Sequence, residues 1–155
     1  MISIRPATID DVTILQKLNQ EIFIDNQKYD NDLDMNWAVS EKGRTYFKSV
    51  LNDKNAICFI AVNSTKPIGY IACNIKDYSY RKSKYLEIQN MGVIPQFQSQ
   101  GIGALLINQV KVWAKQHEFE KMLVNSYFKN TKAIDFYKKN GFSEIDISLE
   151  IKLDY

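Results

Sequence analysis

Residues 91–106 read MGVIPQFQSQGIGALL, and this stretch decides the fold. It leaves an expected strand at Pro95, which cannot donate to a strand ladder, and it then enters an amphipathic helix. The first N–H groups of a helix lack intrahelical partners and lie at the positive end of the helix dipole. Gly101 and Gly103 have no Cβ, so the chain can approach a ligand closely and form an anion-binding nest. The stretch indicates a phosphate-binding turn, although a tight turn or a close-packing site would use the same glycines.

Two familiar phosphate motifs do not fit this stretch. The dinucleotide fingerprint requires three glycines after the first strand and an acidic residue roughly 20 positions later, and the Walker motif requires Gly-Lys-Ser/Thr. Here the glycine pair comes after three or four expected strands, and no lysine follows Gly103. The turn therefore points to a different class of phosphate-binding protein.

The surrounding pattern predicts alternating strands and helices. Strands are expected over residues 2–5, 56–62, 68–73, 85–94, 121–127 and 145–153. Helices are expected over residues 8–23, 46–51, 101–116 and 131–140. The strand, helix and strand from 85 to 127 predict a right-handed crossover with parallel pairing. From Ile145 to Leu153 apolar and polar residues alternate strictly, which predicts a last strand with one face on the core and the other in water.

Composition restricts the class of protein. The 155 residues, 45% apolar and 25% charged, suit one soluble globular domain over residues 1–155. A net charge of +2 without a basic block gives no nucleic-acid footprint. One histidine and two cysteines, Cys58 and Cys73, cannot form a zinc constellation, so no metal is expected. No targeting segment or membrane-length apolar run is present, and we expect a cytoplasmic protein that does not bind membranes.

Two motifs together resemble the GNAT superfamily of acetyl-CoA-dependent N-acetyltransferases. The first is Val93-Ile94-Pro95 followed by Gln98-Ser99-Gln100-Gly101-Ile102-Gly103, and the second is Asn130 to Tyr137 (NTKAIDFY) followed by Gly141-Phe142. The resemblance covers essentially the whole chain. It implies an α/β (α+β) GNAT fold: a central mixed twisted sheet of about six to seven strands, flanked by about four helices. A V-shaped splay is expected between the fourth and fifth strands.

The resemblance also implies where acetyl-CoA, the co-substrate, would bind. The pantetheine arm would pair with the freed backbone of the splayed strand, the pyrophosphate would take the N–H groups of the glycine turn, and the side chain of Asn130 would hold the pantetheine. Gln98 and Ser99 depart from the commonest Arg and Gly, which weakens charge pairing and loop flexibility. The implied residues are Met91, Gly92, Val93, Gln98, Ser99, Gln100, Gly101, Ile102, Gly103, Ala104, Asn130, Ala133 and Tyr137.

Acetyl transfer to an amine needs a group that removes a proton, because free alkylamines are mostly protonated at neutral pH. Glu87 lies six residues before Val93, and we assign it to the strand face that carries Met91 and Val93. We take Glu87 as the general base, acting directly or through water; the alternative is a solvated strand glutamate. The resemblance makes Tyr137 the proton donor to the CoA thiolate, and simple core packing is the alternative. Cys58 and Cys73 lie in apolar runs and are expected to be inert.

The acetyl acceptor is not identified by the sequence. An acidic and aromatic connection between the first two helices could receive a cationic amine of a small molecule or a protein, or could simply be a solvated loop. Its residues are Asp25, Tyr29, Asp30, Asp32, Asp34 and Trp37. The expected activity is direct transfer of acetyl from acetyl-CoA to a primary amine in a ternary complex. The alternative is a non-catalytic acyl-CoA sensor, and residues 145–153 could pair two copies into a homodimer.

Overall fold

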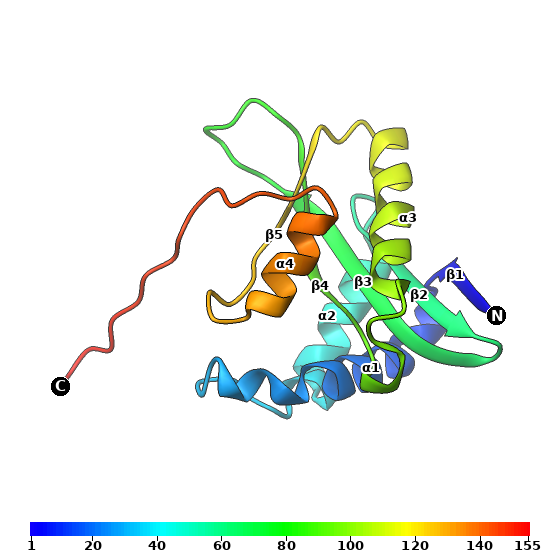
Figure 1. Cartoon of the computed structure of the whole chain (residues 1–155), viewed down its shortest axis with the longest axis horizontal. Coiled ribbons are helices and arrows are strands. Elements are labelled where there is room, and N and C mark those ends of the chain that lie inside the picture. Colours follow the sequence, from blue (N-terminus) through cyan, green and yellow to red (C-terminus); the bar gives the residue numbers. More distant parts are fainter.

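The computed structural model describes residues 1–155 and contains one mixed sheet of five strands. The strands lie in sequence order across the sheet: β1 (Ile2–Pro6), β2 (Ile57–Asn63), β3 (Lys66–Lys76), β4 (Tyr85–Val93) and β5 (Lys121–Val124). Strands β1 to β4 pair antiparallel, and β5 pairs parallel to β4 after a helical crossover, as the sequence predicts. Figure 1 shows the sheet with helices on both of its faces.

Four α-helices and several short 3₁₀ turns surround the sheet. The α-helices are α1 (Val12–Phe23), α2 (Glu41–Asn52), α3 (Ile102–Gln116) and α4 (Thr131–Lys139). Helix α1 packs on one face, where its Ile22 lies against Gly92 of β4. Helix α3 packs on the opposite face and contacts α4 through Gly103 and Phe136. None of these helices combines the length and the apolar character that crossing a membrane requires.

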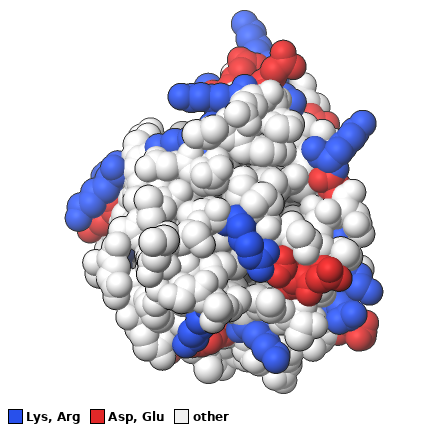
Figure 2. Space-filling model, turned by 90° about the vertical axis from the view of Figure 1, so that its right-hand side faces the viewer, with Lys and Arg blue, Asp and Glu red and all other residues white.

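The core lies between the sheet and these two helical layers. Strands β2 and β3 are buried along most of their length, as expected for the apolar runs that predict a hairpin covered on both faces. Leu15, Phe47, Tyr70, Ile71 and Leu106 are completely buried. Cys58 and Cys73 are buried free thiols, and burial raises the pKa of both, which supports the expectation that they are inert. On the face drawn in Figure 2, basic and acidic side chains are interspersed and do not gather into one basic patch.

The prediction of six to seven strands is wrong, because the sheet has five. Residues 145–153 form no strand, and their apolar side chains are 60% to 92% exposed. After Phe142 the chain extends away from the body (Figure 1), so the segment has no strand beside it to accept and donate ladder hydrogen bonds. The alternation therefore predicts a strand that the structure does not contain, because alternation along the chain does not supply a pairing partner.

A β-bulge in β4 corrects the predicted position of Glu87. Ala72 pairs with Asn90 and Cys73 pairs with Ile88, so Gln89 is an extra residue on β4. An extra residue reverses the alternation of side chains beyond it. Glu87 therefore shares a face with Asn90 and Gly92, toward α1 and α2. Met91 and Val93 point to the opposite face, toward α3, and the expectation that Glu87 shares their face is wrong.

Candidate active site

Strands β4 and β5 separate beyond Ile88. Their pairing is confined to Tyr85–Ile88 on β4 and Lys121–Val124 on β5. From Gln89 to Val93, β4 has no partner strand on the β5 side, because β5 ends at Val124. The backbone groups that this half of β4 directs away from β3 are thus open to a ligand that lies like an added strand. The exception is the Val93 carbonyl, which accepts a hydrogen bond from the Gln98 side chain. The separation agrees with the predicted splay between the fourth and fifth strands.

The turn before α3 presents free backbone N–H groups. No protein acceptor takes a hydrogen bond from the N–H groups of Ser99 to Ala104, and the first bond of α3 runs from the Leu105 N–H to the Gly101 carbonyl, at 3.1 Å. Ser99 and Gly101 have φ values of 60° and 81°, in the left-handed region. Left-handed residues in such a turn direct successive N–H groups toward one concave site. A negatively charged oxygen is the ligand that such a site binds best.

The two glycines of this turn have different roles. A Cβ on Gly101 would meet nothing within 4 Å, whereas a Cβ on Gly103 would lie 2.9 Å from the Phe136 ring. Gly103 is therefore needed for the close contact of α3 with α4, which is the close-packing alternative. Gly101 is needed for its left-handed backbone beside open space, which is the arrangement expected at a ligand.

Gln98 acts differently from its neighbours in this turn. Its N–H donates to the Pro95 carbonyl at 3.3 Å. This amide is therefore not free, contrary to the expectation that it binds the pyrophosphate. Its side chain Nε2 donates to the Val93 carbonyl at 3.0 Å. Gln98 therefore connects the turn to the end of β4 and holds it in position beside the open half of that strand.

The second motif places Asn130 and Tyr137 on α4. The Asn130 Oδ1 accepts from the Ala133 N–H at 3.2 Å and so caps α4, which leaves its Nδ2 group without a protein partner. The ring of Tyr137 packs between Phe136 and Phe142, with centroid distances of 5.3 and 5.7 Å. Burial raises the pKa of Tyr137 to about 12, so its hydroxyl keeps its proton at neutral pH. No protein group hydrogen-bonds this hydroxyl, and it is not enclosed, so it can donate to a ligand.

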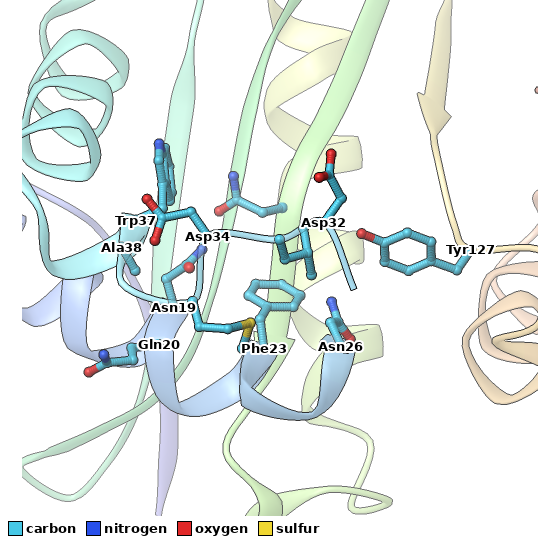
Figure 3. A pocket seen from close by; sticks show the side chains of 12 residues that line it. Asn19, Gln20, Phe23, Asn26, Asp32, Asp34, Trp37, Ala38 and Tyr127 are labelled. Carbon is cyan, nitrogen blue, oxygen red and sulfur yellow. The ribbon is translucent and has the colours of Figure 1, made fainter. Parts of the chain in front are cut away.

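A cavity of about 400 Å³ opens on the α1 and α2 face (Figure 3). Asp32, Asp34 and Trp37 line it, as the sequence analysis expects of them. Asp25 does not line it. Asp30 accepts a hydrogen bond from the Tyr127 hydroxyl at 3.1 Å, and Tyr29 stacks on Tyr127 at 5.8 Å. The remaining lining residues are Asn19, Gln20, Phe23, Asn26, Leu33, Met35, Ala38, Asn90 and Tyr127.

A chain of hydrogen bonds fixes the Asn90 side chain in the wall of this cavity. Asn19 Nδ2 donates to the Tyr70 hydroxyl at 2.6 Å, and that hydroxyl donates to Asn90 Oδ1. Asn90 Nδ2 donates to the Tyr46 hydroxyl at 2.8 Å, which donates to Gln89 Oε1 at 2.7 Å. Burial raises the pKa of both tyrosines, so they remain neutral. Sequence reasoning missed this network, since its members come from four separate elements and carry no local motif.

Glu87 precedes Asn90 on the same face of β4. Its carboxylate is partly buried, with 17% of the side chain exposed, and lies 3.9 Å from Lys76 Nζ. Glu87 does not line the cavity itself. The next position on this face, Asn90, does line it, and the backbones of the two residues are about one strand repeat, ~7 Å, apart.

Comparison with known proteins identifies relatives. The model of the acetyltransferase (GNAT) family matches residues 16–142. The uncharacterized N-acetyltransferase MJ1207 of Methanocaldococcus jannaschii is 30% identical over 146 residues, which are 94% of this chain and 62% of that protein. N-alpha-acetyltransferase 50 of Danio rerio is 30% identical over 146 residues, 94% of this chain and 76% of that protein. The chain therefore spans less than two thirds of the first relative.

A solved structure has the same fold. It is AAC(6')-Iy in complex with the bisubstrate analogue CoA-S-monomethyl-acetylneamine. The TM-score is 0.77 at 18% sequence identity, and the match covers 100% of this chain and 99% of the other. At this identity the similarity shows the fold and does not identify the substrate.

Proposed function

The chain belongs to the acetyltransferase (GNAT) family, a family of acetyl-CoA-dependent acyltransferases, and from this premise we propose that it acetylates a primary amine. The acetyl group passes directly from acetyl-CoA to the amine in a ternary complex, within one domain over residues 1–155. The observation that carries the proposal is the row of free N–H groups from Ser99 to Ala104 beside the unpaired half of β4.

Acetyl-CoA lies in the gap between β4 and β5. Its pyrophosphate accepts hydrogen bonds from the free amides at the start of α3. Its pantetheine arm pairs with the backbone of Met91 and Val93 and accepts a hydrogen bond from the free Nδ2 group of Asn130. The CoA-linked analogue named for AAC(6')-Iy supports this assignment, because that enzyme shares the fold over the whole chain.

The amine enters from the cavity on the α1 and α2 face. Asp32 and Asp34 attract a cationic amine, and Trp37 offers an aromatic face to it. One relative is an N-alpha-acetyltransferase, and one solved structure of the same fold is an aminoglycoside antibiotic 6'-N-acetyltransferase. The two acceptor classes to test first are therefore peptide N-termini and aminoglycosides.

Two side chains on opposite faces of the sheet divide the proton transfers. Glu87 removes a proton from the ammonium group, directly or through water, and the neutral nitrogen attacks the thioester carbon. A backbone N–H at Met91 or Val93 stabilises the oxyanion. As the C–N bond forms and the C–S bond breaks, Tyr137 donates its phenolic proton to the thiolate. The nitrogen releases its remaining extra proton to water, and Tyr137 takes a proton back from water. The raised pKa of Tyr137 supports this role, because the proton is present at neutral pH.

A thiol-release assay tests the proposed function. The protein is incubated with acetyl-CoA and a panel of primary amines, and free CoA is measured with a thiol reagent. Cys58 and Cys73 are buried, so they contribute little background. We expect amine-dependent release of CoA and a matching mass increase of the acceptor. Binding of acetyl-CoA by calorimetry, with no turnover on any amine, would contradict the proposal and favour an acyl-CoA sensor.

A further inference from the structure

We propose that the hydroxyl groups of Tyr46 and Tyr70 fix the position of the bulge in β4 and thereby direct the backbone N–H of Met91 into the gap between β4 and β5. The two tyrosines are positioning residues, because they act through β4 and not through contact with acetyl-CoA or the amine. Their effect on the reaction rate rests on the proposed function, whereas their effect on the bulge does not.

The ladder of β4 is interrupted at the bulge. On β3, Ala72 pairs with Asn90 and Cys73 pairs with Ile88, so Gln89 has no partner residue. The pairing of β4 with β5 also ends at Ile88. A bulge disrupts the ladder locally, and the ladder alone therefore does little to decide which residue is the extra one. Side chains around the bulge have to make that choice.

The Tyr46 hydroxyl, on α2, contacts two consecutive residues of the bulge. It donates to Gln89 Oε1 at 2.7 Å and accepts from Asn90 Nδ2 at 2.8 Å. In a regular strand the side chains of consecutive residues point to opposite faces, so one hydroxyl could not bond both. The two hydrogen bonds of Tyr46 thus require the bulge to lie where it does.

The Tyr70 hydroxyl, on β3, holds the same bulge from the interior. It donates to Asn90 Oδ1 and accepts from Asn19 Nδ2 of α1 at 2.6 Å. The Asn90 amide is therefore held at its oxygen by Tyr70 and at its nitrogen by Tyr46. Tyr70 and Asn19 are buried, so a displaced bulge would leave polar groups without partners away from water. That cost opposes movement of the bulge.

The two tyrosine rings are themselves held in place by aromatic packing. Tyr46 packs against Trp37 and Phe47, with centroid distances of 5.5 and 5.0 Å. Tyr70 packs edge-on against Phe47 at 6.0 Å, and Phe47 is completely buried. A hydroxyl on a fixed ring defines a point in space, so these rings can set the bulge to one position.

The position of the bulge decides which amides of β4 face the gap. The Ile94 N–H donates to the Ile68 carbonyl of β3 at 2.8 Å. Backbone groups alternate in direction along a strand, so the N–H groups of Met91 and Val93 point away from β3 and into the gap. A bulge displaced beyond Met91 would turn its N–H toward β3. In the proposed function this N–H is one of two that could stabilise the oxyanion, so its direction affects the rate.

Backbone NMR of the full chain tests the proposal without requiring turnover. Tyr46→Phe and Tyr70→Phe keep each ring and remove its hydroxyl. We expect exchange broadening of the amide signals of residues 91–93, which neither hydroxyl contacts, as the bulge moves between positions. Tyr85→Phe is the matched control: Tyr85 also lies in β4, and its hydroxyl accepts from Arg81 Nη1 at 3.2 Å, outside the network. Unchanged signals in Tyr46→Phe, or equal broadening in the control, would overturn the proposal.

Steady-state kinetics gives a second readout that a purely structural role would not change. In Tyr46→Phe we expect kcat to fall about tenfold and KM for acetyl-CoA to change less than about threefold, because a misdirected N–H affects the transition state more than binding. Tyr85→Phe should change neither constant. Reduced stability of Tyr46→Phe with unaltered kcat would overturn the positioning role.

Two further outcomes are separated by the same measurements. Tyr70→Phe leaves buried groups unpaired, and if circular dichroism shows that it does not fold, Tyr46→Phe decides alone. Absence of turnover in the wild-type protein would overturn the proposed function, and the NMR comparison would still decide whether the tyrosines fix the bulge.

Discussion

The two faces of β4 are built by different means. On the α3 face, ligand groups come from the backbone: the amides from Ser99 to Ala104 and the open edge of the strand. On the α1 and α2 face, they come from side chains of separate segments, such as Asn19, Asp32 and Asn90. A short local turn can thus supply the groups that bind a diphosphate, whereas a pocket lined by side chains is assembled from several distant segments.

The bulge at Gln89 connects the two faces. The bulge reverses the alternation of side chains along β4. Glu87 therefore lies on the side of the sheet that carries the cavity, whereas Met91 and Val93 face α3. A base on one face and a proton donor on the other, the roles proposed for Glu87 and Tyr137, can act on opposite sides of a thioester held in the gap. The predictions below separate the contributions of the two faces.

The largest expected effect is at Glu87, on the acceptor face. Glu87→Gln removes the proposed base and should lower kcat by about 10²- to 10⁴-fold, with little change in acetyl-CoA affinity. Steady-state kinetics and calorimetry measure the two quantities. Glu118→Gln, in the turn after α3, is the matched control and should leave both unchanged. Unaltered kcat in Glu87→Gln would remove the assigned role.

On the opposite face, Tyr137→Phe keeps the ring and removes the hydroxyl. We expect kcat to fall by about 10²-fold, because the thiolate then leaves without a proton donor. Since the pKa of Tyr137 is raised to about 12, the hydroxyl stays protonated as pH rises through the neutral and mildly alkaline range. The wild-type rate should show no alkaline decline there from this group. Tyr80→Phe, on the exposed β3–β4 connection, is the control, and equal rates in both variants would contradict the role.

The glycine turn gives a smaller effect that distinguishes ligand binding from packing. Gly101→Ala places a Cβ in the left-handed region at a strain of about 1–2 kcal/mol. The exposed turn can relax by leaving that conformation, and acetyl-CoA must then restore it on binding, which should weaken binding roughly 5- to 30-fold. Gly103→Ala places a Cβ 2.9 Å from Phe136 and should instead lower the free energy of unfolding. We expect a loss of about 1–3 kcal/mol, measured by urea denaturation. If both variants lose stability alike and bind alike, the two glycines have the same role after all.

The smallest effect is expected in the acidic loop. Asp32→Asn should raise KM for a cationic acceptor only about two- to fivefold, because the carboxylate is exposed and screened by salt. The effect should shrink at high ionic strength, and acetyl-CoA affinity should not change. Asp25→Asn is the matched control, since Asp25 lies in the same loop region but outside the cavity. The same change in KM for both variants would mean that the loop acts only through its total charge.

The fold was predicted where local pattern and pairing coincide. The hairpin of β2 and β3, the crossover through α3 and the parallel β5 follow from apolar runs and connection lengths. Residues 145–153 have the pattern without the pairing. Their alternation is the clearest in the chain, but a strand exists only beside another strand, and none lies next to them within this chain.

The candidate site was predicted unevenly for the same reason. The turn at Ser99 to Gly103 and the Asn130 cap are local and carry motifs. The cavity members Asn19, Phe23 and Tyr127 carry none, because they come from α1 and from the segment after β5, which meet only in the folded chain. The face of Glu87 depends on one extra residue in a ladder, which no spacing along β4 alone reveals.

The amino-acid sequence by itself determined the family, the order of most strands and helices, and the free amides at the start of α3, because these depend on residues close together in the chain. Only the tertiary structure decided the bulge at Gln89, the network that holds Asn90, the lining of the cavity and the unpaired state of residues 145–153. These depend on which surfaces pack together, and packing joins residues whose separation along the chain carries no signal.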